Sequence, residues 1–191
     1  MMRTITVSAP GKLMLFGEHA VVYGHPCIVT AVGQRLFLTV TRDTGHVTSR
    51  KNTLQIEAPD VQVANYTKPL EHLGKGDIPK GARFIEFGVK NFLAHQGVSL
   101  LGDSLKRSIG ISTRSEFSSQ FGFGSSSASA VCVIKALSEL FEIALSNKDI
   151  FDLAYKTVLD VQGKGSGFDV AAAIYGGTLG YVAGGEVIES L

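Results

Sequence analysis

Residues 120–143 read QFGFGSSSASAVCVIKALSELFEI, a Gly/Ser segment that runs directly into a helical pattern. Glycine reaches backbone conformations that a Cβ would block, so Gly122 and Gly124 allow successive amide N–H groups to point at one bound anion. The first helical turn that we expect carries three consecutive serines, Ser125, Ser126 and Ser127. Because the first N–H groups of a helix are unpaired and the helix dipole is positive there, the segment predicts a phosphate-binding loop.

The helix after this loop is predicted to be a core helix. Apolar side chains recur in it at helical spacing and would bury one face; they are Val133, Ile134, Leu137, Leu140 and Phe141. Glycine-rich loops before helices are common, so a flexible linker leading into an ordinary core helix is the alternative interpretation of this segment taken alone.

The composition indicates a compact protein without a strongly charged surface. The chain has 191 residues, of which 45% are hydrophobic, enough for one domain or for one domain and a fragment of another. The net charge is +1 and the basic residues are scattered, which argues against nucleic acid or an anionic membrane as a partner. Cys27 and Cys132 lie in apolar runs and fit no metal spacing, so we expect buried thiols in a cytoplasmic protein. No leader or membrane-spanning segment is expected.

The pattern of the rest of the chain predicts an α+β fold. Strand patterns lie at 3–9, 13–16, 36–40, 53–57 and 109–111. Helical patterns lie at 82–95, at 146–162 after a capping box of Ser146 and Asp149, and at 169–175, and a hairpin is expected at 179–188. Pro10-Gly11 predicts a turn, and residues 59–80 predict an irregular excursion. Because helices and strands do not alternate regularly, α+β is favoured over a doubly wound fold.

Three segments, in this order, resemble the motifs of one family of small-molecule kinases. They are APGKLMLFGEHAVVYG at 9–24, GFGSSSA at 122–128, and GSGFDVA at 165–171 followed by Tyr175-Gly176-Gly177. The family includes galactokinase, homoserine kinase, mevalonate kinase and phosphomevalonate kinase. The first segment is most similar to its counterpart in mevalonate kinases.

The resemblance implies a particular domain organisation. Kinases of this family have an N-terminal α+β domain, a ribosomal-protein-like two-layer α/β sandwich, and a C-terminal ferredoxin-like domain. Residues 1–191 would be the N-terminal nucleotide-binding kinase domain, and the C-terminal domain with its glycine-rich third motif is absent from this sequence. The chain stops at Leu191, one residue after a strand pattern, which suggests a truncated chain, a split gene or an incomplete reading frame, although natural chains can end in a hairpin. By the resemblance we expect the N-terminal half of a kinase.

The activity that the resemblance implies is ATP-dependent phosphorylation of the primary hydroxyl of mevalonate, a step of isoprenoid precursor synthesis, with ATP and Mg²⁺ as cofactors. By this resemblance Asp169 accepts the hydroxyl proton or orients the nucleophile, and Lys12 stabilises its carboxylate form or contacts phosphoryl oxygens. Without the resemblance, an aspartate at a helix start is usually a cap, and a lysine after Pro-Gly is usually a solvated surface charge.

The resemblance also assigns the remaining candidate site residues. Glu18 and His19 would reach the acceptor substrate, although such a pair in a turn is otherwise unremarkable. The ATP phosphates would contact the loop residues Gly122, Gly124, Ser125, Ser126 and Ser127, and the Ser126 hydroxyl would also contact Mg²⁺.

One departure concerns the metal. Mevalonate kinases usually have a Mg²⁺-binding glutamate where this chain has Val158. Asp160 lies two residues on, a rotation of about 200° along a helix, so it would face away. Gln162 shares the face of Val158, but a neutral amide is a poorer ligand for a hard cation. We therefore expect ATP phosphates, Ser126 and water to hold most of the Mg²⁺ coordination.

The acceptor and the completeness of the enzyme stay open. Residues 162–169, QGKGSGFD, resemble the phosphomevalonate kinase version of the segment, so phosphomevalonate is the alternative acceptor, with Lys164 as the one candidate cation near the motif. A further alternative is a non-catalytic fragment or one half of a two-chain kinase. Its exposed apolar face would then favour self-association or a C-terminal-half partner chain.

Overall fold

The computed structural model describes residues 2–43, 52–97, 108–119 and 121–191. Within them, seven strands form one sheet in the order β4-β3-β5-β2-β6-β7, and β1 pairs with β2 outside this path. The strands are β1 (Met2–Phe16), β2 (Cys27–Asp43), β3 (Thr53–Ala58), β4 (Val63–Pro69), β5 (Ile109–Ser115), β6 (Thr178–Val182) and β7 (Val187–Ser190). The β3–β5 pair is parallel and the other pairs are antiparallel, so the sheet is mixed.

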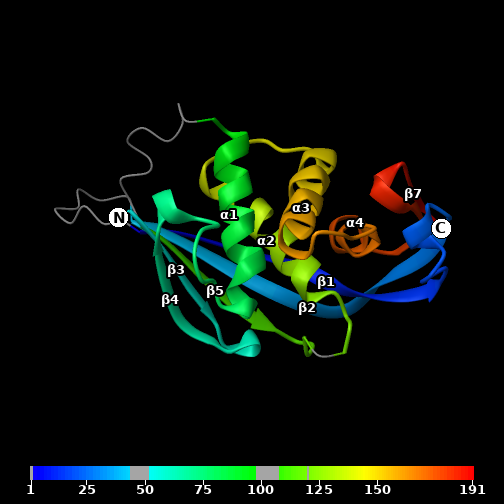
Figure 1. Cartoon of the computed structure of the whole chain (residues 1–191), viewed down its shortest axis with the longest axis horizontal. Coiled ribbons are helices and arrows are strands. Elements are labelled where there is room, and N and C mark those ends of the chain that lie inside the picture. The colour runs from blue at the N-terminus through cyan, green and yellow to red at the C-terminus, as the bar shows by residue number, and fades with distance from the viewer. Residues whose placement is uncertain (1, 44–51, 98–107, 120) are drawn as a thin grey trace.

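Four α-helices lie together on one face of this sheet (Figure 1). They are α1 (Arg83–His95), α2 (Ser125–Leu140), α3 (Asn147–Gln162) and α4 (Phe168–Tyr175). Helix α2 packs directly on β1 and β2, with α1 and α3 beside it, and α4 also packs on β1. The predicted mixture of helices and strands is confirmed as a mixed α/β fold.

Strand β1 departs from the sequence-based prediction. Pro10-Gly11 does not form a turn, because β1 stays paired with the long strand β2 on both sides of it. The register instead shifts between Pro10 and Lys12, which is a bulge. A Cβ placed on Gly11 would lie 3.1 Å from the carbonyl oxygen of Phe123, so the bulge brings this strand close to the Gly/Ser loop.

The predicted excursion at 59–80 is also wrong in part, because it contains β4. The strand pattern is hidden by two polar side chains, Tyr66 and Lys68, that point toward the helices. There they contact Glu86, a completely buried carboxylate of α1. Polar residues on the inner face remove the alternation by which a strand is normally recognised.

Helix α2 is more buried than its apolar stripe predicts. Besides the expected stripe, in which Phe141 is only half-buried, it buries Ser127, Ala128, Ala130, Val131, Cys132, Ala136 and Ser138. Small side chains allow the helix to lie between the sheet and its two neighbours. Such a helix holds its N-terminus, and the loop before it, in a fixed position.

The other predicted elements are confirmed, most of them with small boundary shifts, but the strand predicted at 36–40 is part of the much longer β2, which begins at Cys27. The helix predicted at 82–95 is α1, and the capping box of Ser146 and Asp149 opens α3, with each side chain bonded to the backbone of the other. The hairpin is formed by β6 and β7. Cys27 and Cys132 are free and buried, and burial raises the pKa of the Cys132 thiol to about 12.

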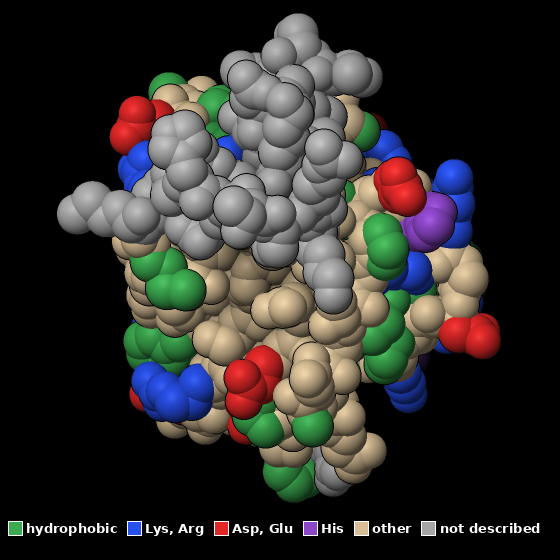
Figure 2. Space-filling view, turned by 90° about the vertical axis from the view of Figure 1, so that its left-hand side faces the viewer, with side chains coloured by type: hydrophobic (Ala, Val, Ile, Leu, Met, Phe, Trp, Pro, Cys, Tyr) green, Lys and Arg blue, Asp and Glu red, His purple; other side chains and the backbone are tan. Residues whose placement is uncertain are grey.

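The surface fits the small net charge. On the face shown in Figure 2, acidic and basic side chains of the described residues are interspersed rather than gathered by sign. Among the helices of the described part, none has the length and apolar character needed to cross a membrane.

Candidate functional site

The three sequence motifs meet at the start of α2. The backbone N–H of Lys12, in β1, donates a hydrogen bond to the carbonyl oxygen of Phe123 at 2.9 Å. A Cβ placed on Gly124 would lie 3.1 Å from Cγ of Lys12 and 3.7 Å from Cβ of Asp169. Lys12, which precedes the loop in the sequence, and Asp169, which follows it, therefore both lie next to Gly124.

The backbone of Gly124 opens α2 and leaves its first amides available. Gly124 is the N-cap residue with φ of 80°, a left-handed conformation that favours glycine, and no side chain caps the helix in the described structure. The first intrahelical bond is donated by Ala128 to the Gly124 carbonyl oxygen. The amides of residues 125–127 therefore precede the helical ladder and form a concentrated anion-binding surface.

Asp169 lies in the first turn of α4 and faces α2. The N-cap residue of α4 is Gly167, so Asp169 is not the helix cap that the sequence predicts without the family resemblance. The Ser127 hydroxyl donates to Oδ2 of Asp169 at 2.6 Å, and Oδ1 accepts the Val170 N–H at 3.0 Å. Since Ser127 is buried, this bond fixes the carboxylate against the start of α2.

The Lys12 side chain reaches the same point from β1. Its ammonium nitrogen lies 5.0 Å from the ring centroid of Phe168, a cation–π distance. Among the described residues it has no carboxylate within 4.0 Å, Asp169 included, so the two groups are neighbours without forming an ion pair. The ammonium remains available for a ligand anion.

Glu18 and His19 lie further out, in the turn after β1. Both side chains are exposed. In the described structure, neither side chain forms a hydrogen bond or an ion pair, so neither is bonded to Lys12 or Asp169. Their place in an acceptor site stays a prediction.

A hollow of about 430 Å³ lies beside the start of α2. Its lining combines Ser125, Ser126 and Ser129 of the helix with Asp60, Val61, Gln62, Lys80, Gly81, Phe84 and Ser119. The contribution of the segments 60–62 and 80–84 is not predicted from the sequence. No local pattern marks them, because they meet only through the packing of the 3₁₀ helices Pro59–Val61 and Lys80–Ala82.

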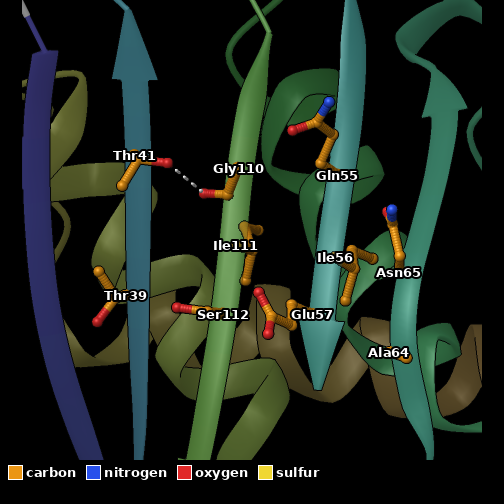
Figure 3. A pocket seen from close by; sticks show the side chains of 10 residues that line it. All are labelled: Thr39, Thr41, Gln55, Ile56, Glu57, Ala64, Asn65, Gly110, Ile111 and Ser112. Atoms are coloured by element: carbon orange, nitrogen blue, oxygen red, sulfur yellow. Dashed lines mark hydrogen bonds between the residues drawn. The ribbon is translucent and has the colours of Figure 1, made fainter. Parts of the chain in front are cut away.

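A second hollow, of about 420 Å³, lies on the sheet face away from the helices (Figure 3). Side chains of β2, β3, β4 and β5 line it, and Figure 3 shows Thr41 bonded across to the carbonyl oxygen of Gly110. It contains none of the predicted site residues.

The side-chain oxygen atoms near Gly124 could supply only some of the ligands that a Mg²⁺ ion needs. Val158 is buried, and a Cβ on Gly165 would lie 3.2 Å from its Cγ1. Asp160 accepts hydrogen bonds from Asn91 and Lys156, which confirms that it is directed elsewhere. No group of three or more metal-ligating His, Cys, Asp or Glu residues occurs in the part of the chain that the structure describes. Asp169 and the serine hydroxyls would fit a Mg²⁺ ion held mainly by nucleotide phosphates and water.

Two tyrosines near the site should make the free energy of unfolding decrease at high pH. Burial raises the pKa of Tyr155 and of Tyr181 above the ordinary value of 10.0. The unfolded chain then ionises first, so the stabilisation is complete below pH 10 and is lost as pH rises beyond it. We expect the free energy of unfolding, measured with urea between about pH 8 and 11, to fall above pH 10. Tyr181→Phe should flatten this fall and Tyr23→Phe, at an exposed position, should not; equal slopes would contradict the assignment.

Comparison with known families gives this geometry a context. Residues 87–177 match the family described as GHMP kinases N terminal domain. The chain carries a GHMP kinase N-terminal domain. The matched region contains two of the three motifs, the loop before α2 and the segment of α4 with Asp169, while the first motif, at 9–24, lies before it.

Curated relatives of this GHMP kinase domain are mevalonate kinases. That of Pyrococcus furiosus is 34% identical over 186 residues, which cover 94% of this chain and 52% of the relative. That of Aeropyrum pernix is 32% identical over 191 residues, which cover 99% of this chain and 54% of the relative. The chain thus spans about half the length of the curated relatives it matches.

Solved structures share the fold. The mevalonate kinase of Methanococcus jannaschii has a TM-score of 0.80 at 22% identity, covering 99% of this chain and 56% of that one. The L. major mevalonate kinase in complex with R-mevalonate has a TM-score of 0.70 at 24% identity, covering 99% and 52%. The Streptococcus pneumoniae phosphomevalonate kinase, in complex with phosphomevalonate and AMPPNP, has a TM-score of 0.71 at 20% identity, covering 94% and 50%.

Proposed function

We propose that this GHMP kinase domain takes part in the ATP-dependent phosphorylation of the primary hydroxyl of mevalonate. In this proposal, residues 1–191 are the N-terminal nucleotide-binding domain of the kinase and form a two-layer sandwich of the ribosomal-protein-like kind. The observation that carries the proposal is the start of α2, where the first amides of the helix and the side chains of Lys12 and Asp169 meet at Gly124.

The nucleotide is proposed to lie along the start of α2. Its β- and γ-phosphates would accept hydrogen bonds from the amides of Ser125, Ser126 and Ser127, with Gly122 and Gly124 shaping the loop. The hollow beside Ser126 would hold the base and ribose, since it opens next to these amides and is lined on one side by Phe84.

The chemistry follows from what faces the γ-phosphate. The mevalonate hydroxyl oxygen forms a bond to the γ-phosphorus, the bond from that phosphorus to the bridging oxygen of ADP breaks, and Asp169 takes the hydroxyl proton. The Lys12 ammonium neutralises charge on the transferring group. Mg²⁺, when bound through the phosphates and Ser126, would supply further charge neutralisation. Orientation by the Ser127 hydrogen bond keeps the carboxylate ready for the acceptor.

The acceptor is proposed to approach from the end of β1. Glu18 and His19 lie in the turn there, and His19 suits the carboxylate of mevalonate. The rival acceptor, phosphomevalonate, carries an additional phosphate that needs cations. Lys164 is the one basic residue of the loop at 163–167, which precedes Asp169.

Binding measurements test the assignment of ligands. Isothermal titration of the 191-residue chain with AMPPNP and Mg²⁺ should show one site. Gly124→Val should weaken binding at least tenfold, because a side chain there meets Lys12 and valine disfavours the positive φ that this position has. Binding that is unchanged by Gly124→Val would contradict the phosphate site. Tighter binding of phosphomevalonate than of mevalonate would favour the rival acceptor.

A second proposal is that the chain by itself does not catalyse the transfer of phosphate from ATP to mevalonate. It rests on the half-length match to the curated relatives. An assay of ADP release with ATP, Mg²⁺ and mevalonate decides it: measurable turnover by the isolated chain would exclude a non-catalytic half. Nucleotide binding without turnover would support a two-part kinase.

A further inference from the structure

Two tyrosine hydroxyls hold the loop that leads into Asp169. The Tyr155 hydroxyl, from α3, donates to the carbonyl oxygen of Gly165 at 2.8 Å. The Tyr181 hydroxyl, from β6, donates to the next carbonyl oxygen, that of Ser166, at 2.5 Å. Consecutive carbonyls of one loop are thus fixed from two different elements of the fold.

The loop is packed against both rings as well as bonded to them. Gly167 has φ of 87°, and a Cβ placed on it would lie 2.6 Å from the Tyr181 hydroxyl oxygen and 3.1 Å from the Tyr155 ring. The Ser166 carbonyl also accepts the backbone N–H of Gly184 at 3.0 Å. This closeness requires glycine at 167 and leaves the loop little room to shift.

We propose that Tyr155 and Tyr181 are positioning residues that clamp residues 165–167 and thereby set the place of the Asp169 carboxylate. The proposal rests on the proposed function of Asp169. The clamp ends at Gly167, the N-cap of α4, and Asp169 follows two residues later in the first helical turn. A displacement of the loop therefore moves the carboxylate directly.

Neither hydroxyl needs to react for this role. Each is committed to a loop carbonyl, and burial raises both pKa values, so the two phenols stay protonated donors across the neutral range. Misplacement of a catalytic group by about 1 Å can lower a rate by about 10²-fold. The clamp thus acts on turnover through geometry while leaving the phosphate loop at the start of α2 unchanged.

The test removes one oxygen at a time with Tyr155→Phe, Tyr181→Phe and the double variant. Thr157→Val is the matched control, because it removes a buried hydroxyl from the same helix, which donates to the Leu153 carbonyl oxygen and accepts from Asn91, neither of them a residue of the 163–170 peptide. Amide hydrogen exchange of the peptide covering 163–170 is measured on the 191-residue chain. AMPPNP affinity is measured on the same chain. The values of kcat and KM are measured on the kinase preparation that releases ADP in the assay described above, which contains this chain.

Each Tyr→Phe variant should raise exchange in 163–170 at least tenfold and lower kcat by about 10-fold to 10²-fold, with AMPPNP affinity changed less than threefold. Thr157→Val should leave all three unchanged. Unchanged exchange, or faster exchange with unchanged kcat, would overturn the clamp. If the wild-type kinase does not phosphorylate mevalonate, the proposed function fails, while the exchange result still decides whether the two tyrosines hold the loop.

Discussion

Replacing Asp169 by alanine should abolish phosphoryl transfer and leave nucleotide binding within a few-fold. Within the described residues, the hydrogen bond of this carboxylate to α2 is to the Ser127 hydroxyl and not to a backbone amide, so its loss should not alter the amides that are proposed to hold the phosphates. Removal of a positioned base typically costs 10² to 10⁴-fold, on the order of 3–5 kcal/mol of transition-state stabilisation. Turnover is measured with ATP and mevalonate on the turnover-competent kinase, and binding with AMPPNP.

Asp152→Ala is the matched control for this prediction. Asp152 is an exposed carboxylate of α3, paired with Lys148, and its loss should change neither quantity. If Asp169→Ala retains turnover, Asp169 has no part in the chemistry. If it instead loses nucleotide binding, its role is structural.

Replacing Glu86 by alanine should give the largest loss of stability. Glu86 is fully buried, and its carboxylate accepts hydrogen bonds from the Tyr66 hydroxyl at 2.7 Å and the Gly74 amide at 2.7 Å. It also pairs with the Lys68 ammonium at 3.1 Å. Alanine would remove this acceptor from all three donors, of which only the Lys68 ammonium keeps another, the Lys75 carbonyl oxygen, and the loss is expected to cost about 3–5 kcal/mol. Urea unfolding measures the change.

Glu57→Ala gives the comparison on an exposed carboxylate of the neighbouring strand β3, where a change within about 0.5 kcal/mol is expected. A loss from Glu86→Ala that is no larger would show that water replaces the carboxylate at the α1–β4 contact. Because residues 80–84 line the hollow beside α2, the same variant should also weaken AMPPNP binding.

The sequence predicts the parts of this molecule that depend on local signals. The capping box at Ser146, the glycines before α2 and the hairpin after α4 each follow from a few neighbouring residues, and the structure has all three. The order of three short motifs also predicts the kinase family. What local signals could not give is the bulge at Pro10, since it depends on pairing with β2, where Pro10 lies opposite Arg35 and Lys12 opposite Ala31.

The missed features share one cause, which is that they exist only after packing. Strand β4 hides its pattern because Tyr66 and Lys68 satisfy a buried carboxylate of α1. The hollow beside α2 joins segments from three parts of the chain, and the tyrosine clamp joins α3 to β6. Such sites carry no spacing in the sequence, whereas Gly124 and Asp169 were predictable because each lies within a motif.

The most direct measurement is a crystal structure of the chain with AMPPNP and Mg²⁺. The account predicts triphosphate oxygens within hydrogen-bond distance of the amides of residues 125–127, with the carboxylate at 169 and the ammonium at 12 on either side of the terminal phosphate. A nucleotide bound instead in the hollow on the helix-free face of the sheet would contradict it.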